Sequence, residues 1–436
     1  MLRRLTAVPG RPGRLRALVL DVALVGGGVY VSYGALFAVS VLVNRGLGTA
    51  ELGYYGLALA VGQLAVQSVT DGFSALLKRD VSVAPARAAE LAGVYGTLKA
   101  TAAGTLYLAV LMAAFVGEAA GTVPPALAWT LAFVVGAVAV ESVGRTFPEA
   151  LQASGRNAVY SAVLIGGAFA VLALVGGALL AGAGALAVYA ALLVARTVAA
   201  GGALAVFWQS AGRVAPGVTG AEARRIVGAS WPLVVNGLVF VATARAGTLV
   251  LAQFGGAEDV GVFTFASSVV AGASMVASSA GIVLFPVLCR EHEAGGRRLR
   301  TVLYVSTAAL ALAGAAAVGA LRVAEPLVVA VFGRLPAGAI PVLRLLSLGL
   351  VPIFGSVPAG YLFTAIGQQR EGMMYSFVQA AVTVSLLVAF TARAGVTGTA
   401  AAIVVAQALM LVVAVVWLDT RHLAPRAAEA ISHTAR

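Results

Sequence analysis

The chain is poor in the residues that build catalytic and metal sites. Its 436 residues include one cysteine, Cys289, which excludes an intrachain disulfide and a cysteine metal cluster. The three histidines, His292, His422 and His433, do not form a cluster with the spacing of metal ligands. No glycine-rich motif that cradles phosphate is present, which argues against an ATP-driven pump. We therefore expect neither a cofactor nor an enzymatic activity.

Charge is also scarce. Charged residues make up 11% of the chain and hydrophobic residues 61%, whereas soluble domains have about 25% charged and roughly 45–50% apolar residues. Nearly all of the chain falls into apolar runs of about 20 residues, the length that crosses a bilayer. The hydrophobic pattern predicts an all-α integral membrane protein with about twelve transmembrane helices, at 17–43, 52–77, 90–116, 124–146, 157–181, 184–208, 230–253, 260–288, 301–320, 341–366, 372–392 and 397–418.

The basic residues are distributed unevenly between the two ends of these spans. The net charge is +12, and of the 29 basic residues 21 lie in the two tails and in loops on the same side, against 5 on the opposite side. Cytoplasmic loops of membrane proteins carry such an excess, so we expect both termini in the cytoplasm. The positive charge is therefore a topology signal with some contact to anionic lipid headgroups, and we expect no nucleic-acid partner.

A weak internal repeat relates the two halves of the chain. Residues 48–58 read GTAELGYYGLA and residues 256–266 read GAEDVGVFTFA, and Gly53 matches Gly261 when the two are aligned. A second, weaker match joins LQASGRNAVYS at 151–161 to LFTAIGQQREGMMYS at 362–376. Duplicated halves are typical of transporters, whose repeats move around a central site. We expect two six-helix bundles, residues 1–220 and residues 221–436.

The short motifs around this repeat resemble those of lipid-linked oligosaccharide flippases, the O-antigen-type polysaccharide export branch of the multidrug/oligosaccharidyl-lipid/polysaccharide exporter superfamily. The matching segments are ELGYYGLA at 51–58, SWPL at 230–233, DVGVF at 259–263 and FPVL at 285–288. The resemblance implies a MATE-like fold with a central cavity. It also implies flipping of a polyprenyl-pyrophosphate-linked oligosaccharide to the outer leaflet by alternating access, for cell-surface polysaccharide synthesis.

This resemblance sets the expected partners and location. The partners would be the lipid-linked glycan, the membrane lipids and a coupling H⁺ or Na⁺. The chain has only two lysines among many Ala, Gly, Val and Arg residues, a composition that suggests a GC-rich bacterial genome. We therefore expect a multi-pass protein of the bacterial plasma membrane.

Two arginines inside predicted spans are the first candidates for substrate binding. A pyrophosphate cannot cross hydrocarbon without polar contacts, and the planar guanidinium of arginine binds phosphate through two parallel hydrogen bonds. Ionisable residues inside the membrane usually face a cavity or a partner. Arg245 and Arg196 lie near the middle of their spans. The alternatives are a structural ion pair for either residue and, for Arg196, snorkelling toward the interface.

Polar side chains on the second span are candidates for the cavity lining. Gln63, Gln67, Thr70 and Ser74 share one face of an ideal α-helix. Glutamine suits sugar hydroxyls because its amide both donates and accepts hydrogen bonds, although the same stripe could bond to a neighbouring helix. Asn236 is a further candidate, but on an ideal helix it lies roughly opposite Arg245, nine residues away.

Acidic residues near the cytoplasmic ends are candidates for ion coupling or for a gate. Asp21 could take up H⁺ or Na⁺, or it could pair with a basic residue such as Lys99. Asp71 could bind a coupling cation, or it could pair with Lys78 or Arg79.

Glu141, Arg145 and Glu149 follow one another at intervals of four residues. This spacing predicts a charge ladder along one helix face, with Pro148 disturbing its last step. We interpret it as structural, or as a gate on the cytoplasmic side.

Three other functions remain open from the sequence. A cation-coupled multidrug exporter of the same superfamily would share the fold, but its cavity should be acidic and aromatic, whereas the mid-membrane charges here are mainly arginine. A major-facilitator transporter would carry a Gly-x-x-x-Asp-Arg/Lys-x-Gly-Arg-Arg signature between spans two and three, and DGFSALLKRDVSVAPAR at 71–87 does not match it. A membrane assembly factor that transports nothing is the third.

Overall fold

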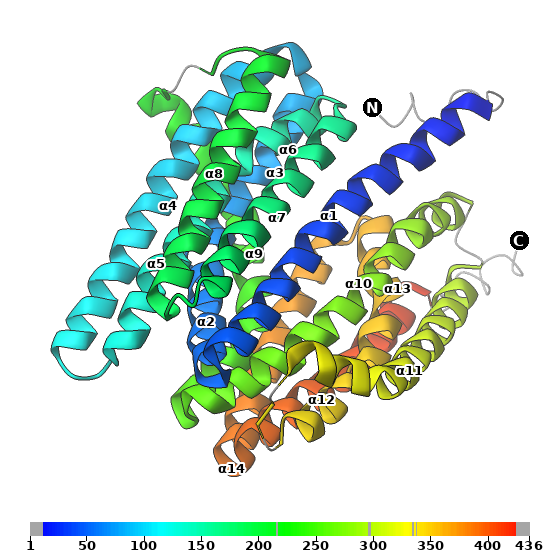
Figure 1. The fold of residues 1–436 in the computed structure, drawn as a ribbon. Helices are drawn as coiled ribbons and strands as arrows, with labels where there is room; N and C mark the ends of the chain where they lie inside the picture. The colour runs from blue at the N-terminus through cyan, green and yellow to red at the C-terminus, as the bar shows by residue number, and fades with distance from the viewer. Residues whose placement is uncertain (1–11, 215–216, 295–297, 334, 337, 424–436) are drawn as a thin grey trace, which may run out of the picture. The chain divides into compact units, whose positions relative to one another are not determined.

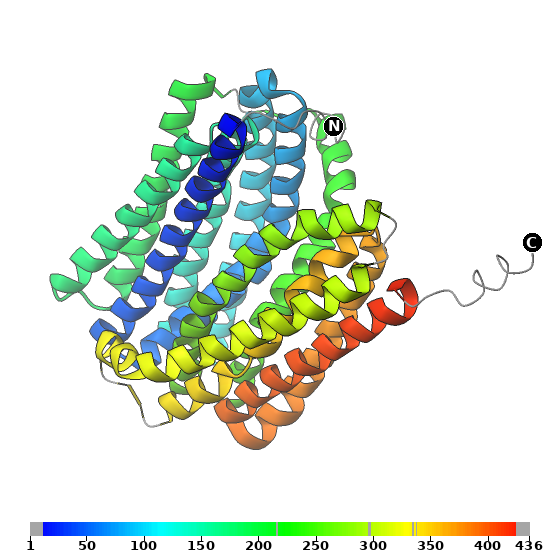
Figure 2. The ribbon, with the colours of Figure 1, turned by 90° about the vertical axis from the view of Figure 1, so that its right-hand side faces the viewer.

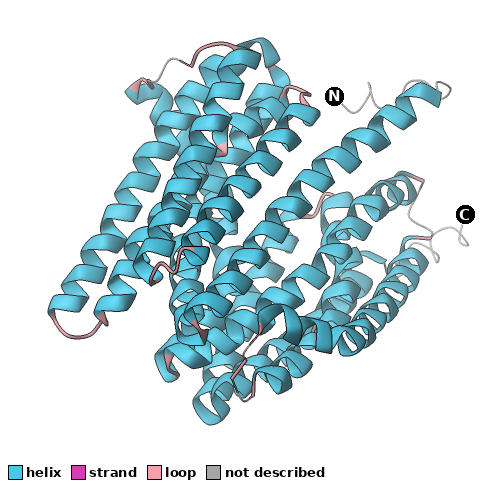
Figure 3. Ribbon diagram, in the orientation of Figure 1, coloured by secondary structure: helices cyan, strands magenta, loops and turns pink. Residues whose placement is uncertain are grey.

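The computed structural model describes residues 12–214, 217–294, 298–333, 335–336 and 338–423, and these residues form helices and short loops without a strand (Figure 3). The helices labelled in Figure 1 have the following bounds: α1 Pro12–Leu47, α2 Thr49–Gly62, α3 Ser68–Val83, α4 Ala88–Ala119, α5 Pro125–Gly144, α6 Thr146–Ala153, α7 Asn157–Leu180, α8 Ala185–Ala211, α9 Gly220–Phe254, α10 Ala257–Glu293, α11 Leu299–Phe332, α12 Ala339–Ser347, α13 Leu350–Ala365 and α14 Gln369–Leu418. Short π turns lie at Gln63–Gln67 and Asp419–Leu423, and a 3₁₀ turn at Pro85–Arg87.

The described residues contain 11 helical segments that are long and apolar enough to cross a membrane. The all-helical membrane fold predicted from the sequence is thus confirmed. The count falls one short of twelve because the segment Gln369–Leu423 covers both of the last two predicted spans. The helical backbone breaks inside it at Ala394 and Gly395, where Gly395 has a φ of 53° and a ψ of −134°. Only glycine adopts such angles without strain, so Gly395 marks the turn between the two spans.

The chain divides into two compact units, each built from several segments. Unit 1 comprises Met1–Val39, Val69–Ala113 and Ala132–Val234, and unit 2 comprises Ser40–Ser68, Ala114–Leu131 and Val235–Arg436. The whole of α2 belongs to unit 2, where it packs against α10. The halves 1–220 and 221–436, like the cytoplasmic position of both termini, stay predictions.

Unit 1 has an apolar core at the ends of α3 and α4. Phe73, Leu77 and Tyr95 are buried there, and α6, α8 and the start of α9 complete the cluster with Leu151, Phe207 and Ile226. Helices α7 and α8 pack side by side (Figure 1). This packing fixes α3, α4 and α6, which carry Asp71, Lys99 and Glu149, respectively.

Unit 2 is organised around α10 and α13. Helices α10, α11 and α13 lie side by side in both ribbon views (Figures 1 and 2), and α14 packs against α13. One core cluster joins α10, α11, α13 and the end of α14 through Leu288, Leu303, Leu362 and Leu418. These four helices therefore share one closely packed core.

The repeat found in the sequence reappears as a reciprocal contact between α2 and α10. A Cβ atom placed on Gly53 would lie 1.8 Å from the carbonyl oxygen of Ala257, and one on Gly261 would lie 2.0 Å from the carbonyl oxygen of Thr49. Positions 49 and 257 match each other in the same alignment that matches Gly53 to Gly261. Each repeat therefore presses its glycine against the backbone of the other, as in a two-fold interface.

At the centre of the contact between α2 and α10, two positions that the sequence repeat aligns with each other are in contact. A Cβ atom on Gly56 would lie 2.1 Å from the Oγ1 atom of Thr264, and these residues are also matched by the repeat. The internal duplication predicted from short sequence motifs is therefore visible in the packing of unit 2.

Candidate functional site

Arg245 lies on α9 in a segment held by close packing. The next residue, Ala246, is buried in a small cluster with Leu387 and Ala402, which come from the two arms of α14. Gly247 follows, and a Cβ atom there would lie 2.7 Å from the ring of Phe263 on α10. This packing fixes the backbone at Arg245, whose own side chain is half-buried.

The guanidinium of Arg245 contacts a residue that the sequence predicts to line the cavity. Its Nε atom donates a short hydrogen bond to the Oε1 atom of Gln63. Gln63 begins the π turn Gln63–Gln67, where the second membrane helix departs from α-helical geometry. Such turns are rare and often mark functional sites. The structure thus brings together a predicted phosphate-binding cation and a predicted lining amide within unit 2.

The π turn changes the expected polar stripe. A π turn contains one residue more than an α turn, so it rotates the faces before and after it by about 100° relative to a continuous α-helix. The π turn therefore rotates Gln63 and Gln67 away from the face that they would share with Thr70 and Ser74 on a continuous α-helix. Gln63 and Gln67 are half-buried in unit 2, whereas Thr70 and Ser74 are buried in unit 1. The Ser74 hydroxyl donates to the Thr70 carbonyl one turn earlier in α3, at 3.3 Å.

Two further candidates are Asn236 and Asp21. Asn236 is exposed on α9, and its role in the cavity lining stays a prediction. Asp21 lies on α1, and its side chain is outside the part of the chain whose side chains the structure describes.

Unit 1 contains a charge network across α3, α4 and α6. Asp71 pairs with Arg145 at 3.5 Å, and Arg145 pairs with Glu149 at 3.3 Å. The Nζ atom of Lys99 lies 3.1 Å from the other oxygen of Glu149, and both side chains are almost fully buried. The ladder step from Arg145 to Glu149 is thus formed despite Pro148.

The network gives Asp71 and Lys99 ion-pair partners that the sequence analysis did not name. The ion pair of Asp71 is with Arg145, since Asp71 and Arg145 face each other across neighbouring helices, whereas Arg79 pairs with its neighbour Asp80. Lys99 pairs with Glu149, and a contact with Asp21 stays a prediction because the side chain of Asp21 lies outside the described ones. The sequence did not identify the pair of Lys99 and Glu149, although a lysine inside a span always requires a partner.

Arg196 pairs with a carboxylate. Its Nη2 atom lies 3.2 Å from the Oε2 atom of Glu141, and its side chain is 15% exposed. This is the structural ion pair considered for Arg196 from the sequence. Arg196 and Arg245 therefore differ in the partners that these contacts give them, a carboxylate for the first and a neutral amide for the second.

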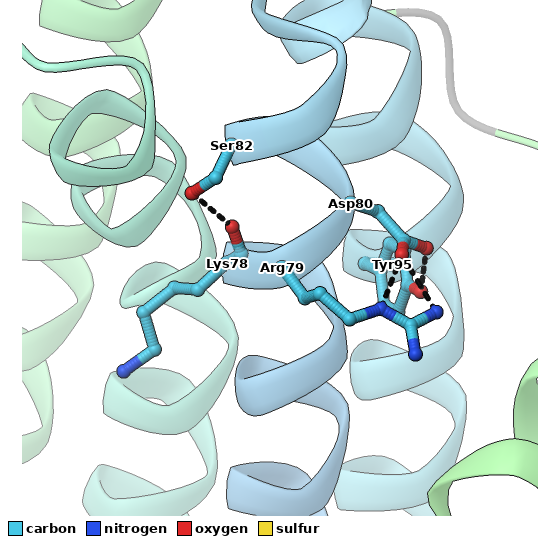
Figure 4. Close-up of polar contacts among 5 residues, drawn as sticks. All are labelled: Lys78, Arg79, Asp80, Ser82 and Tyr95. Carbon is cyan, nitrogen blue, oxygen red and sulfur yellow. Dashed lines mark hydrogen bonds and ion pairs between the residues drawn. The ribbon is translucent and has the colours of Figure 1, made fainter. Parts of the chain in front are cut away.

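The end of α3 carries a second polar group (Figure 4). The Tyr95 hydroxyl donates to Asp80 at 2.7 Å, and Arg79 donates to the other oxygen of Asp80 at 2.9 and 3.1 Å. Lys78 extends from the same turn away from this group, and the Ser82 hydroxyl donates to the Lys78 carbonyl (Figure 4). The Tyr95–Asp80 bond fastens α3 to α4 beside the charge network.

Solved structures with the same fold are membrane transporters. The chain matches an inward-facing multidrug resistance MATE family transporter of the MOP superfamily with a TM-score of 0.71 and 16% identity, over 90% of this chain and 94% of that one. An outward-facing MATE transporter matches with a TM-score of 0.59 and 17% identity, over 92% and 94% of the two chains. A MOP superfamily transporter from Pyrococcus furiosus, described as having a binding pocket of reverse polarity, matches with a TM-score of 0.61 and 16% identity, over 92% and 95%.

A sequence comparison gives the family. A search of curated proteins finds no match. The family model for polysaccharide biosynthesis proteins matches residues 18–292, which is more than half of the chain. The chain therefore belongs to the polysaccharide biosynthesis protein family and is a multi-pass membrane protein.

Proposed function

We propose that the protein flips a polyprenyl-pyrophosphate-linked oligosaccharide from the cytoplasmic to the outer leaflet of a bacterial plasma membrane. The observation that carries this proposal is the pairing of Arg245 with the amide of Gln63 on a π turn inside a membrane helix. Membership of the polysaccharide biosynthesis family supports a glycan as cargo.

The pairing suits an anion site for a physical reason. An arginine that is paired with a carboxylate has its charge compensated by that group, as with Arg196 and Glu141. The amide oxygen on the Nε atom of Arg245 carries no charge, so it competes weakly with a phosphate. Charge-assisted bonds to phosphate are about twice as strong as bonds between neutral groups.

The charge network of unit 1 is proposed to serve coupling or gating. Its members change partners only if a proton, a cation or a helix movement intervenes, because a buried charge without a partner is costly. Arg145 and Asp71 are each more than a third exposed, so this end of the network is open to ions. Glu141 and Arg196 are proposed to act structurally.

The proposal is tested by transfer of an undecaprenyl-pyrophosphate-linked glycan across proteoliposomes. Wild type should transfer it, Arg245→Ala should lose the activity, and Arg245→Lys should retain only part, since lysine keeps the charge without the planar fork. Arg322→Ala serves as a control for arginine loss, because Arg322 on α11 is outside the proposed site and donates to the carbonyl of Arg344. Absence of transfer by wild type would refute the flippase assignment.

The same vesicles test a second function. Solved MATE transporters of this fold are described as multidrug resistance proteins. Transport of ethidium-type cations in place of the glycan lipid would assign the chain to drug export.

A further inference from the structure

We propose that Gln63 is a displaceable partner of Arg245 that selects pyrophosphate lipids carrying a sugar over bare ones. In this inference, which rests on the proposed function, a phosphate oxygen replaces the Gln63 amide on the guanidinium. The released amide then binds a hydroxyl of the first sugar.

The exchange follows from which atom Gln63 occupies. Its Oε1 atom accepts from the Nε atom of Arg245, and Nε together with one terminal nitrogen forms a side-on fork that binds phosphate bidentately. A phosphate bound in this way must displace the amide. The amide satisfies a donor of the guanidinium in the absence of substrate, which avoids the cost of an unpaired donor in a partly buried site.

Displacement leaves the amide beside the substrate. Gln63 is half-buried, so its side chain can change rotamer without a movement of the helix. The first sugar of such a lipid is attached directly to the pyrophosphate, so it lies next to the group that Arg245 holds. An amide donates and accepts at once, as does a sugar hydroxyl.

The backbone of the π turn holds Gln63 in place during this exchange. Gly62 and Val66 on either side of Gln63 are buried in the helix packing. The hydroxyl of Ser68, also buried, donates to the carbonyl of Leu64 at 2.5 Å. Only the side chain of Gln63 therefore has to move, and the geometry of its attachment is set by the turn.

The test compares two probes, undecaprenyl pyrophosphate and undecaprenyl-pyrophosphate-linked N-acetylglucosamine, bound to the full chain in nanodiscs. Wild type should bind the sugar-carrying probe about tenfold more tightly, the effect of one hydrogen bond at roughly 1.4 kcal/mol per decade. Gln63→Leu should keep or improve the affinity for the bare probe and lose the tenfold preference. Gln63→Glu should weaken both probes, since its carboxylate holds Arg245 and repels phosphate.

Controls separate this inference from the function on which it rests. Gln253→Leu removes an exposed glutamine from the same helix as Arg245 and should preserve both affinities and the preference. A Gln63→Leu protein that keeps the wild-type preference would overturn the role of Gln63, while loss of binding in Arg245→Ala would still support the flippase. Failure of wild type to bind either probe would instead overturn both. Should Gln63→Leu not fold, Gln63→Met gives the same comparison.

Discussion

The buried pair of Lys99 and Glu149 predicts an asymmetric effect of removing either charge. Both side chains are at most 4% exposed, and breaking such a pair by removing one partner costs about 3–5 kcal/mol. Glu149→Gln should have this full effect, because it leaves the lysine buried with the positive charge of Arg145 nearby. Lys99→Met should cost less, about 1–3 kcal/mol, because Arg145 remains 3.3 Å from Glu149.

The measurement is the free energy of unfolding in mixed micelles, obtained by titration with a denaturing detergent for each variant. The double variant Lys99→Met with Glu149→Gln should be more stable than Glu149→Gln alone, since no unpaired lysine remains buried. Equal losses in the two single variants, or a larger loss in Lys99→Met, would show that Arg145 does not compensate Glu149. A double variant no better than Glu149→Gln would refute the assignment of the cost to the unpaired lysine.

Two backbone predictions follow from the glycines described above. Gly53→Ala should lower the free energy of unfolding by more than about 2 kcal/mol, because the added methyl group meets the carbonyl oxygen of Ala257. The control is Gly104→Ala, where nothing lies within 4 Å, and it should leave the unfolding free energy unchanged or raise it slightly. Gly395→Ala should cost about 1–2 kcal/mol through its positive φ, measured against Gly360→Ala in open space. Equal unfolding free energies of the Gly53 and Gly104 variants would contradict the close contact of α2 with α10. Equal values for the Gly395 and Gly360 variants would contradict the break in α14.

The membrane fold could be predicted from the sequence because hydrocarbon imposes a simple length rule on apolar runs. The rule also separates the last two spans, 372–392 and 397–418, at the place where the helical backbone breaks. Hydropathy does not give the form of this connection, which depends on the backbone angles of Ala394 and Gly395.

The candidate site was predictable only in its residue types. Arg245 and Gln63 stand out because both are polar residues inside membrane segments. Their hydrogen bond joins helices 182 positions apart in the chain, and no local spacing encodes such a contact. The 3.6-residue pattern also gives no sign of the π turn that rotates the polar stripe. The pattern alone therefore predicts one face for Gln63 and Ser74.

The crossing of the two repeats bears on how a duplicated protein can improve on its ancestor. At the symmetry point, Gly56 meets Thr264, and there is no room for a side chain on both. Two identical, unfused copies would have to place the same residue on both sides, which gives either a gap or a clash. Fusion into one chain removes that constraint, so one copy can supply the hydroxyl-bearing side chain and the other the space that it fills.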